Sequence, residues 1–306
     1  MTTDNNYRRG LYMAGGTAVL WGGMAPIAKI IAHSGLSQVS VMCYRAVIVV
    51  FIMFLWFVLR KESYKLVLSR KMYGIYLLLA LFTMFFNATG YLISCTYLSV
   101  PQALIIHYTF PLVTMIGGVF VTSEKPSVSQ YIGSIMVLMG LYIGFMFGTT
   151  ASNVRISTMG LAWGILSVLG LSGQTLISRK ISLTGLSDPL VQLFYVHCFG
   201  GLLLIIGKSV LLGWEDLVHL TPAIFFVMQY PAIVSGLIAF GLLFASLKYI
   251  PASIASMLCT LEILFALLLT PILLHQIPTF YEIIACGIIL FAVLYSTWKP
   301  KKLSRI

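Results

Sequence analysis

Apolar residues occur along the chain in long runs that short polar stretches separate. A membrane-spanning helix needs about 20 mostly apolar residues, and successive runs reach that length. They lie near residues 10–32, 39–59, 72–97, 101–121, 128–148, 158–178, 189–212, 221–248, 251–273 and 279–297. The separators carry turn and charge signals, as in RKESYKLVLSRK and SEKPS. The pattern predicts an all-α integral membrane protein with ten transmembrane helices.

Composition supports this prediction. Charged residues make up 9% of the chain and apolar residues 59%, whereas soluble domains contain about 25% charged residues. The net charge of +11 would suggest nucleic acid in a soluble chain. Here the basic residues cluster in short loops, which is typical of topology signals and of contacts to anionic headgroups. We therefore expect membrane lipid as a partner and no nucleic acid. The five cysteines lie inside apolar runs without metal-ligand spacing, so no metal site is expected.

The basic residues also predict the orientation. With the N-terminus in the cytoplasm, all but a few of the 19 Lys and Arg residues fall on the cytoplasmic side, as the positive-inside rule requires. An even number of crossings returns the C-terminus to the same side. We expect a multi-pass protein of the cytoplasmic (inner) membrane with both termini in the cytoplasm, and a first helix that is retained rather than cleaved.

Two segments of the chain are nearly the same. Residues 28–38 read AKIIAHSGLSQ and residues 178–188 read SRKISLTGLSD, at an offset of 150, and a second alignment at an offset of 152 pairs Tyr97 with Tyr249. Such spacing indicates a duplication. Each half would contain five helices, an odd number, so the second half enters the membrane from the opposite side. Chance matching of leucine- and glycine-rich helices is the alternative.

The duplication predicts a division of the chain into two inverted five-helix repeats around a central cavity. Two such repeats can exchange conformations and open the cavity to either side in turn, with the substrate near the midplane. The predicted parts are a cytoplasmic N-terminal segment (1–9), the first repeat (10–148), an extracytoplasmic linker (149–157), the second repeat (158–297) and a basic cytoplasmic tail (298–306).

Several motifs are shared with a known family. They are LWGGMAPIAK at 20–29 with its tryptophan and glycines, Arg45 early in the second helix, FPLVTMIGGVFVTSEKPSVSQYIG at 110–133, and LEILFALLL at 261–269. In order and spacing the chain resembles the drug/metabolite transporter superfamily, in its ten-helix EamA-type branch. The resemblance implies that helices one to four and six to nine surround a central cavity, while the fifth and tenth pack together at one side.

The chain departs from that family pattern at two positions in its second half. Ile263 stands where proline often follows the glutamate, and Gln276 stands where a second end-of-repeat glutamate is usual. The differences leave the fold unaffected but put a family-wide coupling role for that glutamate in doubt.

Glu262 is the outstanding ionisable residue inside the predicted membrane. An acidic side chain at mid-helix costs roughly 2.5–3.5 kcal/mol on insertion scales, so Glu262 should face a cavity or a partner. In a functional role it would bind a substrate amine or a proton that is exchanged during the cycle. The alternative is a protonated glutamate that forms a structural hydrogen bond to a neighbouring helix. At the offset of 152 Phe110 corresponds to Glu262, so His107 lies about one turn from the symmetry mate of Glu262. A titratable His–Glu pair is therefore a candidate, and packing is the alternative for His107.

Arg45 lies about seven residues into the second helix. It would meet a substrate carboxylate bidentately, or it would pair structurally or reach the headgroups. An arginine and a glutamate in one cavity suit a zwitterion, so amino acids or amino-acid-like compounds are the expected substrates.

Uncharged polar residues, aromatic residues and a second histidine complete the predicted lining. We predict that it includes Trp21, Asn87, Tyr91, Tyr108, Trp163, Gln174, Tyr195, His197, Gln229 and Tyr230. Aromatic faces with a few polar groups suit an amphiphilic organic molecule. Asn87 and Gln174 are the stronger candidates, because a carboxamide in mid-membrane must find a partner. Packing is the alternative for each of the others.

These features predict a secondary transporter of small organic metabolites. The phosphate-binding Gly-x-x-x-x-Gly-Lys-Ser/Thr pattern is absent from the sequence, so energy would come from a substrate gradient, exchange or a coupled proton. We expect no cofactor and no catalytic residue. The competing hypotheses are a membrane-embedded enzyme, which eight scattered acids do not favour, and a non-transporting sensor or lipid-handling protein. Gly140, Gly144 and Gly148 permit close helix contact, within a monomer or across a homodimer.

Overall fold

The computed structural model describes residues 2–98, 100–148, 157–185, 188–275 and 277–297. Over these ranges the chain consists of helices and connections, without a strand. Eight helical units are long and apolar enough to cross a membrane, and two shorter apolar helices accompany them. The prediction of an all-α membrane protein is confirmed. The predicted tail and all of the predicted linker except Ser157 lie outside the described residues.

The first half contains the first five predicted spans. Its elements are α1 (Thr2–Trp21), α2 (Met24–His33), α3 (Gln38–Leu59), the short η1 (Ser63–Leu66), α4 (Arg70–Ala80), the π-helical η2 (Leu81–Thr89), α5 (Gly90–Tyr97), α6 (Val100–His107), α7 (Phe110–Val121) and α8 (Val128–Gly148). The first helix begins at Thr2 rather than near residue 10, because neither proline nor glycine interrupts residues 2–9.

The second half repeats this order. Its elements are α9 (Thr158–Thr184), α10 (Pro189–Leu211), η3 (Glu215–His219), α11 (Pro222–Val227), the π-helical η4 (Tyr230–Ala239), α12 (Phe240–Ser246), α13 (Ala252–Cys259), α14 (Glu262–Leu274) and α15 (Phe280–Thr297). The sixth span extends beyond the predicted residue 178 to Thr184, where Gly185 ends it in the left-handed conformation (φ 66°).

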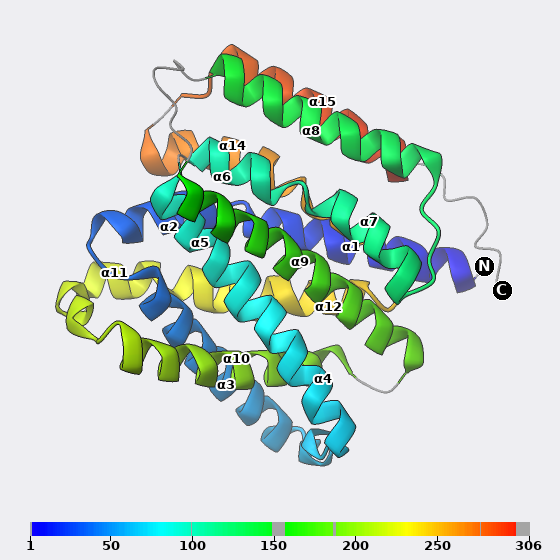
Figure 1. The fold of residues 1–306 in the computed structure, drawn as a ribbon. Coiled ribbons are helices and arrows are strands. Elements are labelled where there is room, and N and C mark those ends of the chain that lie inside the picture. The colour runs from blue at the N-terminus through cyan, green and yellow to red at the C-terminus, as the bar shows by residue number, and fades with distance from the viewer. Residues whose placement is uncertain (1, 99, 149–156, 186–187, 276, 298–306) are drawn as a thin grey trace.

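The repeated Gly-Leu-Ser sequence has a conformational reason. Gly35 (φ 89°) and Gly185 both adopt positive φ after a helix, which glycine does without steric cost. Leu186 and Ser187 lie outside the described residues. The ends of α2 and α9 that carry these glycines lie at opposite ends of the bundle (Figure 1), as an inverted duplication requires.

Interruptions of the helices also match between the halves. The α6–α7 break at residues 108–109 and the α13–α14 break at 260–261 differ by the offset of 152. The two π-helical segments, η2 and η4, lie in the third and eighth spans. Pro231 is the second residue of η4, where its missing N–H favours a local rearrangement of the hydrogen-bond ladder. Irregularities at matched positions support the duplication.

Helices α8 and α15, the fifth and tenth spans, lie side by side along one edge of the molecule (Figure 1). A Cβ on Gly140 would lie 3.0 Å from the Ala285 carbonyl oxygen, and one on Gly144 would lie 2.9 Å from the Ala285 Cβ. These two glycines therefore pack within the chain. The pairing that the family resemblance implied is present.

The start of α1 and the end of α15 lie on one side of the bundle (Figure 1). We call this side the terminal face; it also carries the end of α9 and the α3–α4, α7–α8 and α12–α13 connections. The α2–α3 and α10–α11 connections lie on the other side, which we call the opposite face.

Candidate functional site

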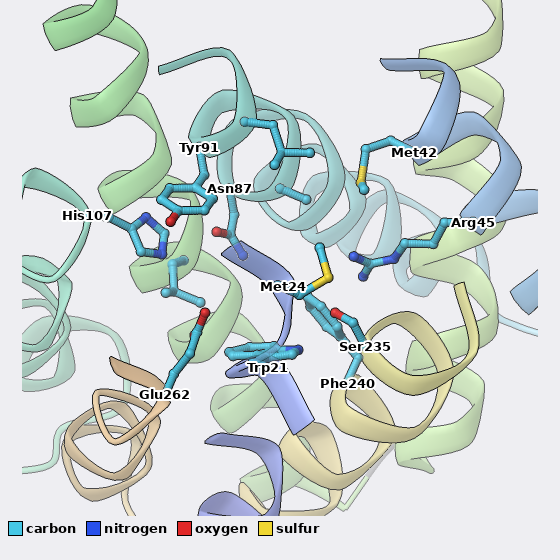
Figure 2. Close-up of a pocket in the computed structure, with 13 residues that line it drawn as sticks. Trp21, Met24, Met42, Arg45, Asn87, Tyr91, His107, Ser235, Phe240 and Glu262 are labelled. Atoms are coloured by element: carbon cyan, nitrogen blue, oxygen red, sulfur yellow. The ribbon is translucent and has the colours of Figure 1, made fainter. Parts of the chain in front are cut away.

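A cavity lies in the middle of the bundle (Figure 2). Its volume is about 60 Å³, which is smaller than the usual small-molecule site. The lining residues come from both halves: Trp21, Met24, Met42, Arg45, Asn87, Ala88, Tyr91, Leu92, His107, Leu171, Ser235, Phe240 and Glu262.

The interruptions of the helices surround this cavity. Trp21 is the last residue of α1, His107 is the last of α6, and Glu262 is the first of α14. Asn87 lies within the π-helical η2. Irregular backbone is tolerated at membrane depth where it faces a cavity or other protein, and π-helical turns are frequent at functional sites. The broken helices thus direct polar side chains to one place.

Glu262 lies at the amino-terminal end of α14. The free N–H groups and the dipole of a helix favour negative charge at that end. The buried side chain of Tyr108 lies near the Glu262 carboxylate. Within the described part of the chain, Glu262 forms no ion pair.

His107 lines the same cavity, on the side of Glu262 (Figure 2). Its Nδ1 lies 3.0 Å from the Ser167 hydroxyl, and its ring centroid lies 4.6 Å from that of Tyr91. The structure therefore brings His107 and Glu262 to one cavity, and the hydrogen bond of Nδ1 goes to Ser167.

Arg45 lies across the cavity from Glu262 (Figure 2) and is only 2% exposed. Its Nε donates to His197 Nε2 at 3.3 Å, and its guanidinium carbon lies 4.5 Å from the Phe240 ring centroid. Nη2 finds no hydrogen-bond partner among the described residues, and no carboxylate there pairs with it. A buried cation without an anion is costly, which marks Arg45 as a ligand-binding candidate.

Two predicted residues that do not line the cavity, Gln174 and Tyr230, lie behind its lining. Asn87 donates through Nδ2 to Gln174 Oε1 at 3.0 Å, and Gln174 is fully buried. Tyr230 bridges the α1–α2 break, where its hydroxyl donates to the Leu20 carbonyl (2.8 Å) and accepts from the Gly23 N–H (3.1 Å). Both arrangements pair polar groups inside the membrane, although Gln174 Nε2 finds no hydrogen-bond partner among the described residues.

Three predicted residues lie away from the cavity. The Tyr195 hydroxyl donates to the Leu66 carbonyl, and its ring stacks on Tyr76 at 5.4 Å. Trp163 packs against Phe85 at 6.0 Å. Gln229 donates to the Tyr44 hydroxyl at 2.6 Å. Each aromatic or amide group is used in packing between helices.

Several lining residues were not predicted. Met24, Met42, Ser235 and Phe240 carry no charge and lie within apolar runs, so neither composition nor spacing separates them from lipid-facing neighbours. Phe240 contacts Trp21 with ring centroids 5.0 Å apart. The glycine pair before Met24 is the one sequence feature that points to this residue, because the helix breaks there and Met24 faces the cavity.

Inverted helical repeats around a cavity that holds buried charges define a membrane transporter. A family model described as "EamA-like transporter family" matches residues 8–146 and again 158–298. The chain therefore belongs to this family of the drug/metabolite transporter superfamily, whose members are transporters. No curated protein matches the chain.

One solved structure, titled "Crystal structure of protein", is similar to this chain with a TM-score of 0.77. The match has 15% sequence identity and covers 97% of this chain and 99% of the other. At that identity the likeness concerns the fold alone.

Proposed function

We propose that this transporter moves small zwitterionic metabolites, amino acids or amino-acid-like compounds, by alternating access. The observation that carries the proposal is the buried Arg45 without an anionic partner, in the same cavity as the acidic Glu262. A substrate carboxylate would accept two parallel hydrogen bonds from the guanidinium. It would also neutralise a charge that the described residues leave uncompensated.

Glu262 is the proposed partner of the substrate amine. Glu262 lies at the start of α14, where the helix dipole stabilises its carboxylate, and no Lys or Arg is among the lining residues on its side of the cavity (Figure 2). Between substrate molecules a proton would neutralise the same carboxylate, so proton coupling belongs to the proposal. Trp21, Met24 and Phe240 supply apolar surface between the two charged ends.

Alternating access is supported by the matched irregularities of the two halves. Because equivalent helices break at equivalent positions, the halves can exchange their conformations about the cavity. The proposed location is the cytoplasmic membrane, with the terminal face in the cytoplasm. The distribution of Lys and Arg residues supports this orientation.

Uptake by proteoliposomes tests the proposal. Purified protein is reconstituted, preloaded with a mixture of unlabelled amino acids, and given each labelled compound outside, with and without a pH gradient. We expect countertransport of at least one zwitterion, and little transport of its amide or its deaminated analogue. Vesicles containing Arg45→Gln serve as the matched control and should be inactive. Absence of transport of every zwitterion by the wild type would refute the proposed substrate class.

A further inference from the structure

Away from the cavity, a buried ion pair lies at each end of the bundle. At the opposite face, Asp216 of η3 accepts hydrogen bonds from Lys208 Nζ (2.9 Å), the Ser40 hydroxyl (2.6 Å) and the Ser37 N–H (2.9 Å). Lys208 is 2% exposed, and its Nζ lies 5.0 Å from the Trp214 ring centroid. Ser37 and Ser40 belong to the first half, so this Asp216 cluster joins the two halves.

The ion pair at the terminal face has the reverse arrangement. Its acid comes from the first half and its cation comes from the second, whereas Asp216 belongs to the second half. Glu124, in the α7–α8 connection, accepts from Arg179 Nε (2.8 Å) and from the Ala252 N–H (3.2 Å). Arg179 Nη2 lies 2.7 Å from the same carboxylate, and Nη1 donates to the Leu247 carbonyl at 2.6 Å. This Glu124 cluster therefore joins the α7–α8 connection to the ends of α9, α12 and α13.

The cavity lies between the two clusters along the helices that carry them. On α3, Arg45 lies five residues beyond Ser40, which is about 8 Å at the rise of an α-helix. On α9, Leu171 lines the cavity eight residues before Arg179, about 12 Å away. The two clusters therefore lie on opposite sides of the cavity, toward the two faces of the bundle.

Asp216 is held in the charged form that an ion pair needs. Although burial raises the pKa of Asp216, the hydrogen bonds from Ser40, Lys208 and Ser37 outweigh it and lower the pKa below its usual value. Glu124 has four donors, since the Thr122 hydroxyl lies 3.2 Å from Oε2. While such an ion pair is formed, it stabilises the contact between the two halves. If its partners separate before water reaches them, each is left as an uncompensated buried charge, which is strongly unfavourable.

We propose that the Asp216 and Glu124 clusters are the two gates of the transport pathway. The Asp216 cluster closes the opposite face and the Glu124 cluster closes the terminal face. Each half-cycle hydrates and separates one cluster while the other stays formed. This proposal rests on the proposed alternating access. It assigns gating to residues outside the cavity lining: Ser40 lies two residues before the lining residue Met42, and Arg179 lies eight residues after Leu171.

The test measures from which side the cavity can be reached. A cysteine at the lining position Ala88 (A88C) is placed in a background in which the five native cysteines are replaced and transport is retained. Membrane-impermeant maleimide is then added to one side of oriented vesicles, and the labelling rate is measured from each face. The isosteric variants Asp216→Asn and Glu124→Gln weaken one gate each and serve as controls for one another.

Opposite changes are expected. Asp216→Asn should raise the labelling rate from the opposite face by about tenfold and lower it from the terminal face, and Glu124→Gln should do the reverse. Changes toward the same face, or unchanged rates in folded variants, would overturn the gating proposal. If either variant fails to fold, Ser40→Ala removes one hydrogen bond of the Asp216 cluster and should give a smaller shift in the same direction; unchanged rates in that variant would overturn the proposal equally.

Uptake by the same vesicles separates the two proposals. Wild-type protein that exchanges zwitterions while the gate variants leave labelling unchanged refutes the gates alone. Wild-type protein that moves no solute refutes the proposed function, whatever the labelling pattern.

Discussion

Around the central cavity the helices are broken or bulged, whereas α8 and α15 run unbroken along the edge of the molecule. The cavity collects buried polar groups, several of them unpaired, such as Arg45 Nη2 and Trp21 Nε1. The α8–α15 pair instead buries glycines against small side chains. Regular helices with small residues supply close packing, and irregular ones supply polar atoms directed at a ligand. Stability and ligand binding should therefore depend on different residues.

Arg45→Gln should have the largest effect on binding. Removing a buried charged partner of a carboxylate costs about 2–5 kcal/mol, which is at least about thirtyfold in Kd. The stability of the empty protein should stay the same or rise, because the substitution removes an uncompensated buried charge. Calorimetric titration and thermal unfolding in detergent would measure the two quantities. Unchanged affinity would show that the substrate does not contact Arg45.

Gly140→Leu should show the opposite combination. The Cβ would lie within 3.0 Å of the Ala285 carbonyl oxygen, and overpacking costs about 1–3 kcal/mol. The melting temperature should fall while the Kd of the substrate stays within about twofold. The exposed Gly287 of α15 has no atom near its Cβ position, so Gly287→Leu is the matched control. Equal destabilisation by both substitutions would argue against the close contact.

Glu262→Gln should change selectivity rather than binding in general. The amide keeps the shape but loses the charge, so amine-containing substrates should bind about tenfold more weakly. Their deaminated analogues should be unaffected. If a proton is carried on this carboxylate, the variant should exchange substrate without responding to a pH gradient. A parallel loss for both kinds of ligand would contradict the amine contact.

His197→Ala should have the smallest effect. The histidine accepts the Arg45 Nε hydrogen bond and lies outside the cavity lining, so it positions Arg45. Loss of one such bond costs about 0.5–1.5 kcal/mol, or about two- to tenfold in Kd. His197→Gln offers a replacement acceptor and should restore part of the affinity, an outcome that loss of packing alone would not produce.

Much of this architecture could be predicted from particular residues. Runs of apolar residues located the spans, and the recurrence of Gly35 and Gly185 indicated the duplication. The offset of 152 aligned Phe110 with Glu262, and these two residues begin the second halves of the fourth and ninth spans. Rare polar residues were the informative ones, because an ionisable group or carboxamide in an apolar run has few tolerable environments.

The cavity lining was predicted only where charge or polarity singled a residue out. Arg45, His107 and Glu262 were found in this way, and they line one cavity. Tyr195 and Trp163 have the same kind of side chain as Tyr91 and Trp21, yet they pack between helices. Aromatic residues suit lipid interfaces, helix contacts and cavities alike, so their type does not indicate which they occupy.

The amino-acid sequence by itself determined the membrane environment, the spans and the inverted duplication, because hydrophobic length and local repetition are properties of neighbouring residues. Only the tertiary structure decided which polar groups share a site. Arg45 donates a hydrogen bond to His197, and the Ser37 N–H donates one to Asp216. Met24 lines the cavity together with residues of other helices. Each of these contacts joins residues from different elements. Such contacts depend on where helices break and how they cross, which side-chain packing sets across the whole bundle.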